Sequence, residues 1–140
     1  MTSFSENLIN ALPNAPVAWC VLPNHYHLLI RSGDLKGLVQ SLGKLHGRTS
    51  FQWNREEKRR GRKIWHGTSD RAIRDSGHFW ASLNYIHHNP VRHGYAQTWQ
   101  DWPWSSASDY LQEVGKKQAE TVWKDYPILE YGKGWDDPAM

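Results

Sequence analysis

Two histidines, His25 and His27, are the first residues of this chain whose types and spacing suggest chemistry. They lie in the stretch 17–30, where two apolar, β-branched-rich runs surround a Pro-Asn turn signal. Because side chains alternate faces along a strand, His25, His27 and Leu29 share one face, and two imidazoles at this spacing can chelate one metal ion. The residues alone also allow one surface histidine and one buried, hydrogen-bonded histidine. Spacing leaves both alternatives open.

A strongly basic segment, residues 55–63, has Lys or Arg at six of its nine positions and lies between two tryptophans. Such a run is either a solvated loop or an arm that contacts phosphates, whose binding would weaken steeply with salt. Tryptophans beside it can stack on unpaired bases, so we favour nucleic acid as the partner. The residues expected to contact DNA are Arg55, Lys58, Arg59, Arg60, Arg62, Lys63, Trp53 and Trp65.

Tyr85 and Asn89 lie one helical turn apart in a segment that we expect to be helical over residues 77–88. Pro90 is expected to close this helix, because it disfavours the helical conformation at the residue before it. Taken singly, Tyr85 is explained as an amphipathic core residue with a solvated hydroxyl. Asn89, taken singly, is explained as a C-terminal cap or as a turn residue before proline. Neither residue indicates a function by itself.

Two motifs are more informative together than apart. They are Pro-Asn-His-Tyr-His-Leu-Leu at 23–29 and Tyr-Ile-His-His-Asn-Pro-Val-Arg-His-Gly at 85–94. The pair resembles the motifs of the single-tyrosine HUH transposases, in particular the REP-associated tyrosine transposases. The similarity covers roughly residues 17–110 and continues, in the family's order, at 61–65 with Gly67, at 73–75 and at 102–106.

This resemblance implies that Tyr85 is a nucleophile and that His25, His27 and Asn89 hold Mg²⁺ or Mn²⁺. A free phenol has a pKa of about 10, so its attack at neutral pH needs help, which a cation that polarises the scissile phosphate can give. The expected product is a 5′-phosphotyrosine with a free 3′-hydroxyl. The expected substrate is single-stranded DNA beside a hairpin, and the protein would act as a monomer or a homodimer.

The expected fold class is α+β, a small and mostly antiparallel sheet with packed helices and a ferredoxin-like core. The His pair is expected on a central strand. Apolar periodicity predicts helices over 3–12, 35–54, 77–88 and 105–113, and strands over 17–22, 25–31 and 64–73. The glycine-containing helix over 35–54 is expected to depend on packing against the sheet. We expect the catalytic domain to span 1–114 and a loosely packed tail to span 115–140. Family members carry an additional N-terminal strand, which we expect this chain to lack.

Composition limits the class of protein. The chain has 140 residues, a formal net charge of +3 and a sequence pI near 9.1, which suits a single domain with a polyanionic partner. No apolar run approaches the roughly 18 residues of a membrane span, and we expect a cytoplasmic protein. The single cysteine, Cys20, is expected to be a small buried apolar residue. His66 is a further histidine that spacing does not assign to the metal.

Two other functions compete with the transposase hypothesis. A catalytically inactive or domesticated DNA-binding protein of the same fold would need no intact Tyr85, His25, His27 and Asn89 set. A zinc hydrolase built on the His-x-His pair would need a further His, Asp or Glu ligand and a nearby base. It would also leave the motif at 85–94 without an explanation.

Overall fold

The computed structural model describes residues 1–31, 33–56, 72–73 and 75–128. They form two compact units. One contains Pro16–Ile30 and Arg71–Met140, together with Met1, and the other contains Thr2–Ala15 and Arg31–Asp70. The expected strand over 64–73, His66, and most of the basic run lie largely or wholly outside the described residues. None of the described helices is long and apolar enough to cross a membrane.

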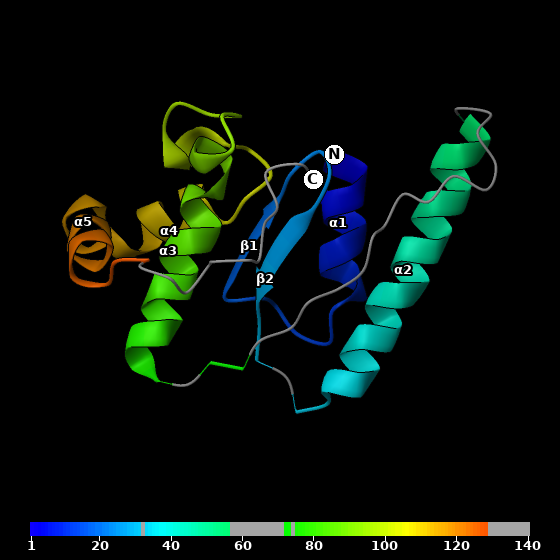
Figure 1. The fold of residues 1–140 in the computed structure, drawn as a ribbon, viewed down its shortest axis with the longest axis horizontal. Helices are drawn as coiled ribbons and strands as arrows, with labels where there is room; N and C mark the ends of the chain where they lie inside the picture. Colours follow the sequence, from blue (N-terminus) through cyan, green and yellow to red (C-terminus); the bar gives the residue numbers. More distant parts are fainter. Residues whose placement is uncertain (32, 57–71, 74, 129–140) are drawn as a thin grey trace. The chain divides into compact units, whose positions relative to one another are not determined.

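The first unit is built on a β-hairpin (Figure 1). β1 (Ala18–Val21) pairs antiparallel with β2 (Tyr26–Leu29), with Cys20 opposite His27. A bond from the Leu22 N–H to the His25 carbonyl, 2.7 Å, closes the turn that the Pro-Asn pair predicts. The fold class is therefore α+β as predicted, although both strands are shorter than expected and His25 lies in the turn before β2.

The other edge of β1 is covered by the segment 102–106. The Val21 N–H donates to the Trp104 carbonyl (2.8 Å), and the Ser106 N–H donates to the Trp19 carbonyl (3.0 Å). Among the described residues β1 therefore lies between two partners, whereas β2 pairs with β1 alone. The expectation that the His pair occupies a central strand is wrong for this part of the chain, because the extended segment joins the β1 side of the hairpin.

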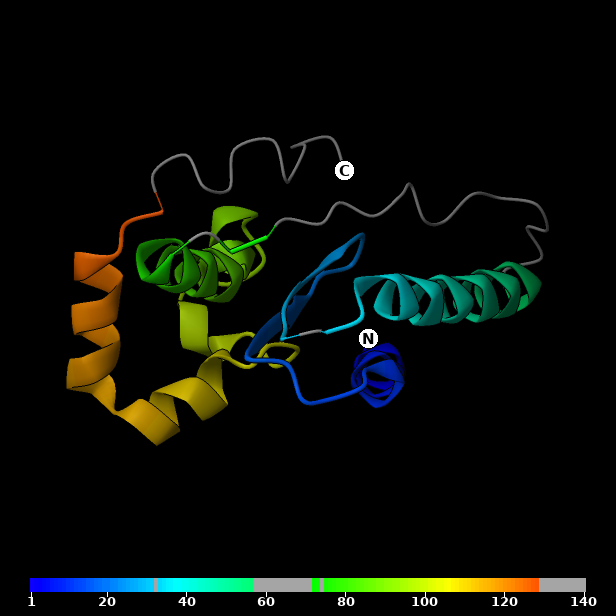
Figure 2. The ribbon, with the colours of Figure 1, turned by 90° about the horizontal axis from the view of Figure 1, so that it is seen from below.

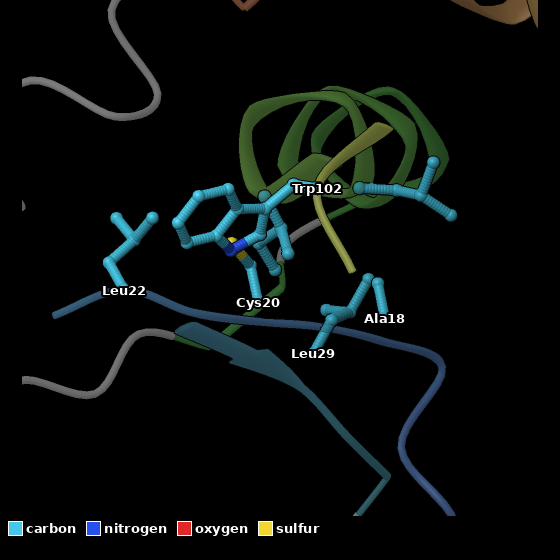
Figure 3. Packing of buried hydrophobic residues seen from close by; sticks show 7 residues of the cluster. Ala18, Cys20, Leu22, Leu29 and Trp102 are labelled. Carbon is cyan, nitrogen blue, oxygen red and sulfur yellow. The ribbon is translucent and has the colours of Figure 1, made fainter. Parts of the chain in front are cut away.

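The core of this unit lies between the hairpin and α3 (Ser76–Arg92). Leu83 and Ile86 of α3 pack with Trp102 and with the inward residues of the hairpin, which are Ala18, Cys20, Leu22 and Leu29. Figure 3 shows the Trp102 indole lying over Cys20. Its Nε1 donates to the Val21 carbonyl at 2.8 Å, so the buried indole N–H is satisfied. Cys20 is fully buried, which confirms its predicted role as a small apolar residue.

Asp75 caps the start of α3: its carboxylate accepts from the His78 N–H at 2.7 Å. Pro90 does not end the helix, which continues to Arg92. A proline this close to the C-terminus deprives the helix of one N–H donor only, and the Pro90 carbonyl accepts from the Tyr95 and Ala96 N–H groups. The expected end of the helix before Pro90 is therefore wrong.

Beyond α3 the chain forms a 3₁₀ turn (Trp99–Asp101), α4 (Ala107–Val114) and α5 (Lys116–Asp125). The last two helices meet at a sharp bend (Figure 2), where Gly115 has φ +86°, a conformation that side chains rarely adopt. The start of the expected loose tail is thus a helix. Its Ala119 and Val122 are buried, and the Asn84 amide donates to the Val122 and Tyr126 carbonyls. The proposed domain boundary at residue 114 stays a prediction.

The second unit contains α1 (Thr2–Ala11) and α2 (Leu35–Glu56), which contact each other. Asp34 caps α2 by accepting from the Gly37 N–H at 2.9 Å. Leu38, Leu42 and Leu45 are buried, as the helical stripe predicts. Within this unit α2 packs against α1. The expected packing of α2 against the sheet stays a prediction.

Candidate active site

The predicted site residues come from two elements of the first unit, the β2 end of the hairpin and α3. The His25 and His27 rings lie 5.1 Å apart, as expected for side chains on one face of an extended segment. The His27 ring meets the Tyr85 ring edge-on at 5.4 Å. The structure therefore brings together the His pair and Tyr85, which are far apart in the sequence. Asn89 follows Tyr85 by one helical turn.

The imidazole of His25 is oriented by its neighbour Asn24. Its Nδ1 lies 2.7 Å from the Asn24 Oδ1, and because that oxygen can only accept, Nδ1 carries the proton. This tautomer leaves the lone pair on Nε2, the arrangement found in metal-binding histidines. The Nε2 atoms of His25 and His27 and the Oδ1 of Asn89 are all shielded from solvent. That these two imidazole nitrogens and one amide oxygen form one donor set stays a prediction.

Tyr85 is 1% exposed and is among the largest fully buried side chains of the described residues. The guanidinium of Arg92, itself an exposed residue, lies 5.2 Å from the centre of the Tyr85 ring. A cation over an aromatic face is attracted by the ring quadrupole and would also stabilise negative charge developing on the phenol oxygen. Since the phenol is covered, DNA can reach it only after part of this cover moves. Arg92 is the long and exposed side chain in that cover.

Like Arg92, His93 lies near the predicted site residues but was not identified from the sequence. It caps the C-terminus of α3, and its ring lies 5.1 Å from the His25 ring. Tyr85, Asn89 and His93 follow one another at intervals of four, so a helical stripe extended past Asn89 would have found it. Among the described residues no three His, Cys, Asp or Glu side chains are grouped so as to hold a metal ion. We therefore assign His93 to packing against His25, and the third acidic or histidine ligand that a zinc hydrolase would need is not present in this part of the chain.

A further pair of histidines, His87 and His88, lies on α3 away from the hairpin histidines. His87 Nε2 is 2.8 Å from the Ser106 Oγ. Burial, and secondarily the charge of His88, lowers the pKa of His87 to about 3. His88 stacks on Trp123 with ring centres 3.7 Å apart, and burial lowers its pKa to about 4. Both side chains are neutral at pH 7 and belong to the packing of the unit.

The predicted DNA-contacting residues are described only in part. Trp53 and Arg55 lie near the end of α2 in the second unit, where Trp53 is half-buried against Phe4 with ring centres 5.8 Å apart. Arg55 is exposed. The other six residues lie outside the described part of the chain: Lys58, Arg59, Arg60, Arg62, Lys63 and Trp65. Their role stays a prediction.

Comparison with known proteins shows the family of the chain. No protein-family model matches the chain. Among solved structures, a REP-associated tyrosine transposase bound to a REP hairpin is similar, with a TM-score of 0.57 and 23% sequence identity. The match covers 79% of this chain and 65% of the length of that structure. This likeness shows the fold. A curated protein of Haemophilus influenzae, named as a REP-associated tyrosine transposase, is 33% identical over an alignment of 134 positions that covers 84% of this chain and 71% of the relative. With that identity and coverage, the chain belongs to the REP-associated tyrosine transposases.

Proposed function

We propose that this protein cleaves and rejoins single-stranded DNA beside a hairpin, with Tyr85 as the covalent nucleophile. The observation that carries the proposal is the contact between the Tyr85 and His27 rings, 5.4 Å apart, in a family of tyrosine transposases. It joins the one tyrosine on the α3 stripe to the His pair. The solved relative in the structural comparison is bound to a REP hairpin, which suggests the same class of substrate here.

The residues present fit a divalent cation. His25, His27 and Asn89 would hold it, through two imidazole nitrogens and an amide oxygen that leave positions for phosphate and water. The proton held on Nδ1 of His25 by Asn24 supports this assignment, because it leaves the lone pair of Nε2 for a cation. When bound, Mg²⁺ or Mn²⁺ would offset the charge of the scissile phosphate and make it a better electrophile.

The chemistry of the chain's own residues is a transesterification. The Tyr85 oxygen forms a bond to phosphorus as the bond from phosphorus to the 3′-oxygen breaks, and the phenol proton is matched by the proton taken up by the leaving 3′-oxygen. The product is a 5′-phosphotyrosine with a free 3′-hydroxyl. Rejoining is the reverse attack by a 3′-hydroxyl. Neither ATP nor water is consumed, because the ester bond is exchanged.

Tyr26 is the alternative tyrosine, since it lies between the two histidines in sequence. It is opposite Val21 in the hairpin, on the face of β2 away from His27. This placement supports Tyr85 over Tyr26 as the nucleophile.

One observation favours a second function. Because Tyr85 is 1% exposed, the described state does not present the nucleophile to DNA, as expected of a protein that only binds DNA. The two functions differ in what covers Tyr85 when DNA arrives. Displacement of Arg92 would make Tyr85 reactive, whereas a permanently covered Tyr85 would leave binding without cleavage.

Covalent capture tests the proposal directly. The protein is incubated with end-labelled hairpin DNA carrying single-stranded flanks, with Mn²⁺ or EDTA, and the products are separated on a denaturing gel. We expect a metal-dependent adduct that is lost in Tyr85→Phe and retained in the matched control Tyr26→Phe. Salt-sensitive binding without any adduct would support the DNA-binding function. An adduct that survives in Tyr85→Phe would overturn the assignment of the nucleophile.

A binding measurement that needs no activity tests the metal ligands. Mn²⁺ affinity is measured by calorimetry on the wild type and on His27→Ala, with His78→Ala on α3 as a control for loss of a histidine. We expect His27→Ala to lose most of the affinity and the control to keep it. Equal Mn²⁺ binding by all three proteins would contradict the proposed ligand set.

A further inference from the structure

The outer face of α2 in the second unit carries an unusual row of side chains. Lys44, Arg48, Phe51 and Arg55 follow one another at intervals of four, three and four, so they lie along one face of the helix. All four are exposed. The only Asp or Glu of the helix is Glu56 at its last position, so most of this row has no acidic residue beside it on its own helix. We call these four residues the α2 row.

Phe51 is the most unusual member of the row, because 67% of its surface is exposed. That is the highest exposure among the large apolar side chains of the described residues. The Phe51 ring is therefore not part of the hydrophobic core of the second unit. An aromatic ring held between cations, on a helix of a DNA-binding family, has the combination that single-stranded nucleic acid requires: stacking for a base and positive charge for the phosphates.

A polar hollow of about 310 Å³ adjoins the row through Arg48. It lies between α1 and α2 and is lined by Asn7, Asn10, Ala11, Leu45, Arg48, Thr49 and Gln52. Leu45 and Thr49 are buried, and the Thr49 hydroxyl donates to the Leu45 carbonyl at 2.8 Å. The amides of Asn7, Asn10 and Gln52 can both donate and accept hydrogen bonds. The edge of an unpaired base also carries donors and acceptors, so the two are complementary.

We propose that the α2 row and the adjoining hollow bind a single-stranded segment of the DNA substrate. A base stacks on Phe51, Lys44, Arg48 and Arg55 contact phosphates, and the amides of the hollow contact the edge of a base. This inference rests on the proposed function for the identity of the substrate. It adds a DNA-binding surface to that function. It also makes Phe51 a residue that stacks on an unpaired base, in addition to Trp53, which is half-buried.

The test measures DNA binding in EDTA, so that cleavage plays no part. The probe is a hairpin whose single-stranded flank carries the fluorescent base 2-aminopurine, and binding is followed by anisotropy over a range of salt concentrations. Phe51→Ala is compared with Leu35→Ala, which truncates another exposed apolar residue of α2 that lies off the row. Arg48→Gln is compared with Lys36→Gln, an exposed cation of the same helix off the row.

We expect Phe51→Ala to weaken binding at least about fivefold and to abolish the change in 2-aminopurine emission, since base stacking supplies that much. Phe51→Trp should restore both. Arg48→Gln should lower the slope of log affinity against log salt by about 0.7, the value for one phosphate contact of a single strand. Both control variants should bind like the wild type.

The inference is overturned if Phe51→Ala and Arg48→Gln bind like their controls, or if Phe51→Trp does not restore binding. Thermal unfolding by circular dichroism checks that each variant is folded, and Phe51, being exposed, tolerates truncation. Failure of the proposed function is seen separately, because a wild type that forms no covalent adduct can still show the stacking signal and the salt slope.

Discussion

Replacing Ser106 with alanine removes only one hydroxyl group but should destabilise the first unit strongly. The Ser106 hydroxyl joins two elements that are far apart in the sequence. It accepts from the Trp19 N–H of β1 at 2.9 Å and lies 2.8 Å from Nε2 of His87 on α3. Its loss would leave both polar groups without this partner in a partly buried position.

The magnitude follows from these two contacts. A buried polar group left without its partner costs about 1–3 kcal/mol. Since Ser106 is only half-buried, water can reach part of the space, and we take the lower half of that range for each group. The free energy of unfolding should therefore fall by about 2–4 kcal/mol, a large part of the 5–15 kcal/mol typical of a domain.

Urea unfolding followed by tryptophan fluorescence measures this change, with Ser108→Ala as the matched control. Ser108 is exposed on α4, and its replacement should change the free energy of unfolding by less than about 0.5 kcal/mol. Amide exchange at Trp19 gives a local measurement, because its N–H should lose protection in Ser106→Ala. The reasoning is refuted if both variants unfold at the same urea concentration and the Trp19 amide stays protected.

Three further predictions concern α3 and its neighbours. Burial lowers the pKa of His87 to about 3, so between about pH 6.5 and 3 the unfolded chain binds a proton that the folded chain does not. The free energy of unfolding should therefore fall as the pH drops through this window, by up to about 1.4 kcal/mol per pH unit. Urea midpoints that do not change between pH 7 and 4.5 would contradict this. Asp75→Ala removes the carboxylate that caps α3 and should cost about 1 kcal/mol, measured by thermal unfolding, and Asp75→Asn should recover most of it. His93→Ala removes the ring that packs on His25 and should weaken Mn²⁺ binding about tenfold, the lower end of what outer partners of metal ligands contribute, while DNA binding in EDTA stays unchanged.

The sequence predicted those parts of the site that depend on one local period. The alternation of a strand places His25 and His27 on one face, and their rings lie 5.1 Å apart. The helical period places Asn89 one turn after Tyr85. The N-cap at Asp75 and the buried Cys20 follow from the same kind of local rule. Each of these features needs only the neighbours of a residue in the chain.

Features that depend on distant residues could not be predicted in this way. The 115–140 segment is polar on average, so nothing in it indicated a packed helix. Two small apolar residues of α5, Ala119 and Val122, are nevertheless buried, and the Asn84 amide bonds to carbonyls 38 and 42 residues further along the chain. The helical continuation past Pro90 likewise depends on N–H groups of residues 95 and 96, which satisfy the Pro90 carbonyl.

The segment 102–106 shows how a family motif can act at a distance from the chemistry. The segment is part of the resemblance to the family, and its contacts are made with the hairpin and with α3. Instead, Trp102 lies over Cys20 and donates to Val21, and Ser106 holds Trp19, so the segment fixes β1 against α3. Because β2 is held by β1, the distance between His27 and Tyr85 depends on this segment. The site is therefore positioned from the far edge of the hairpin, where the Ser106 hydroxyl joins β1 to His87 of α3.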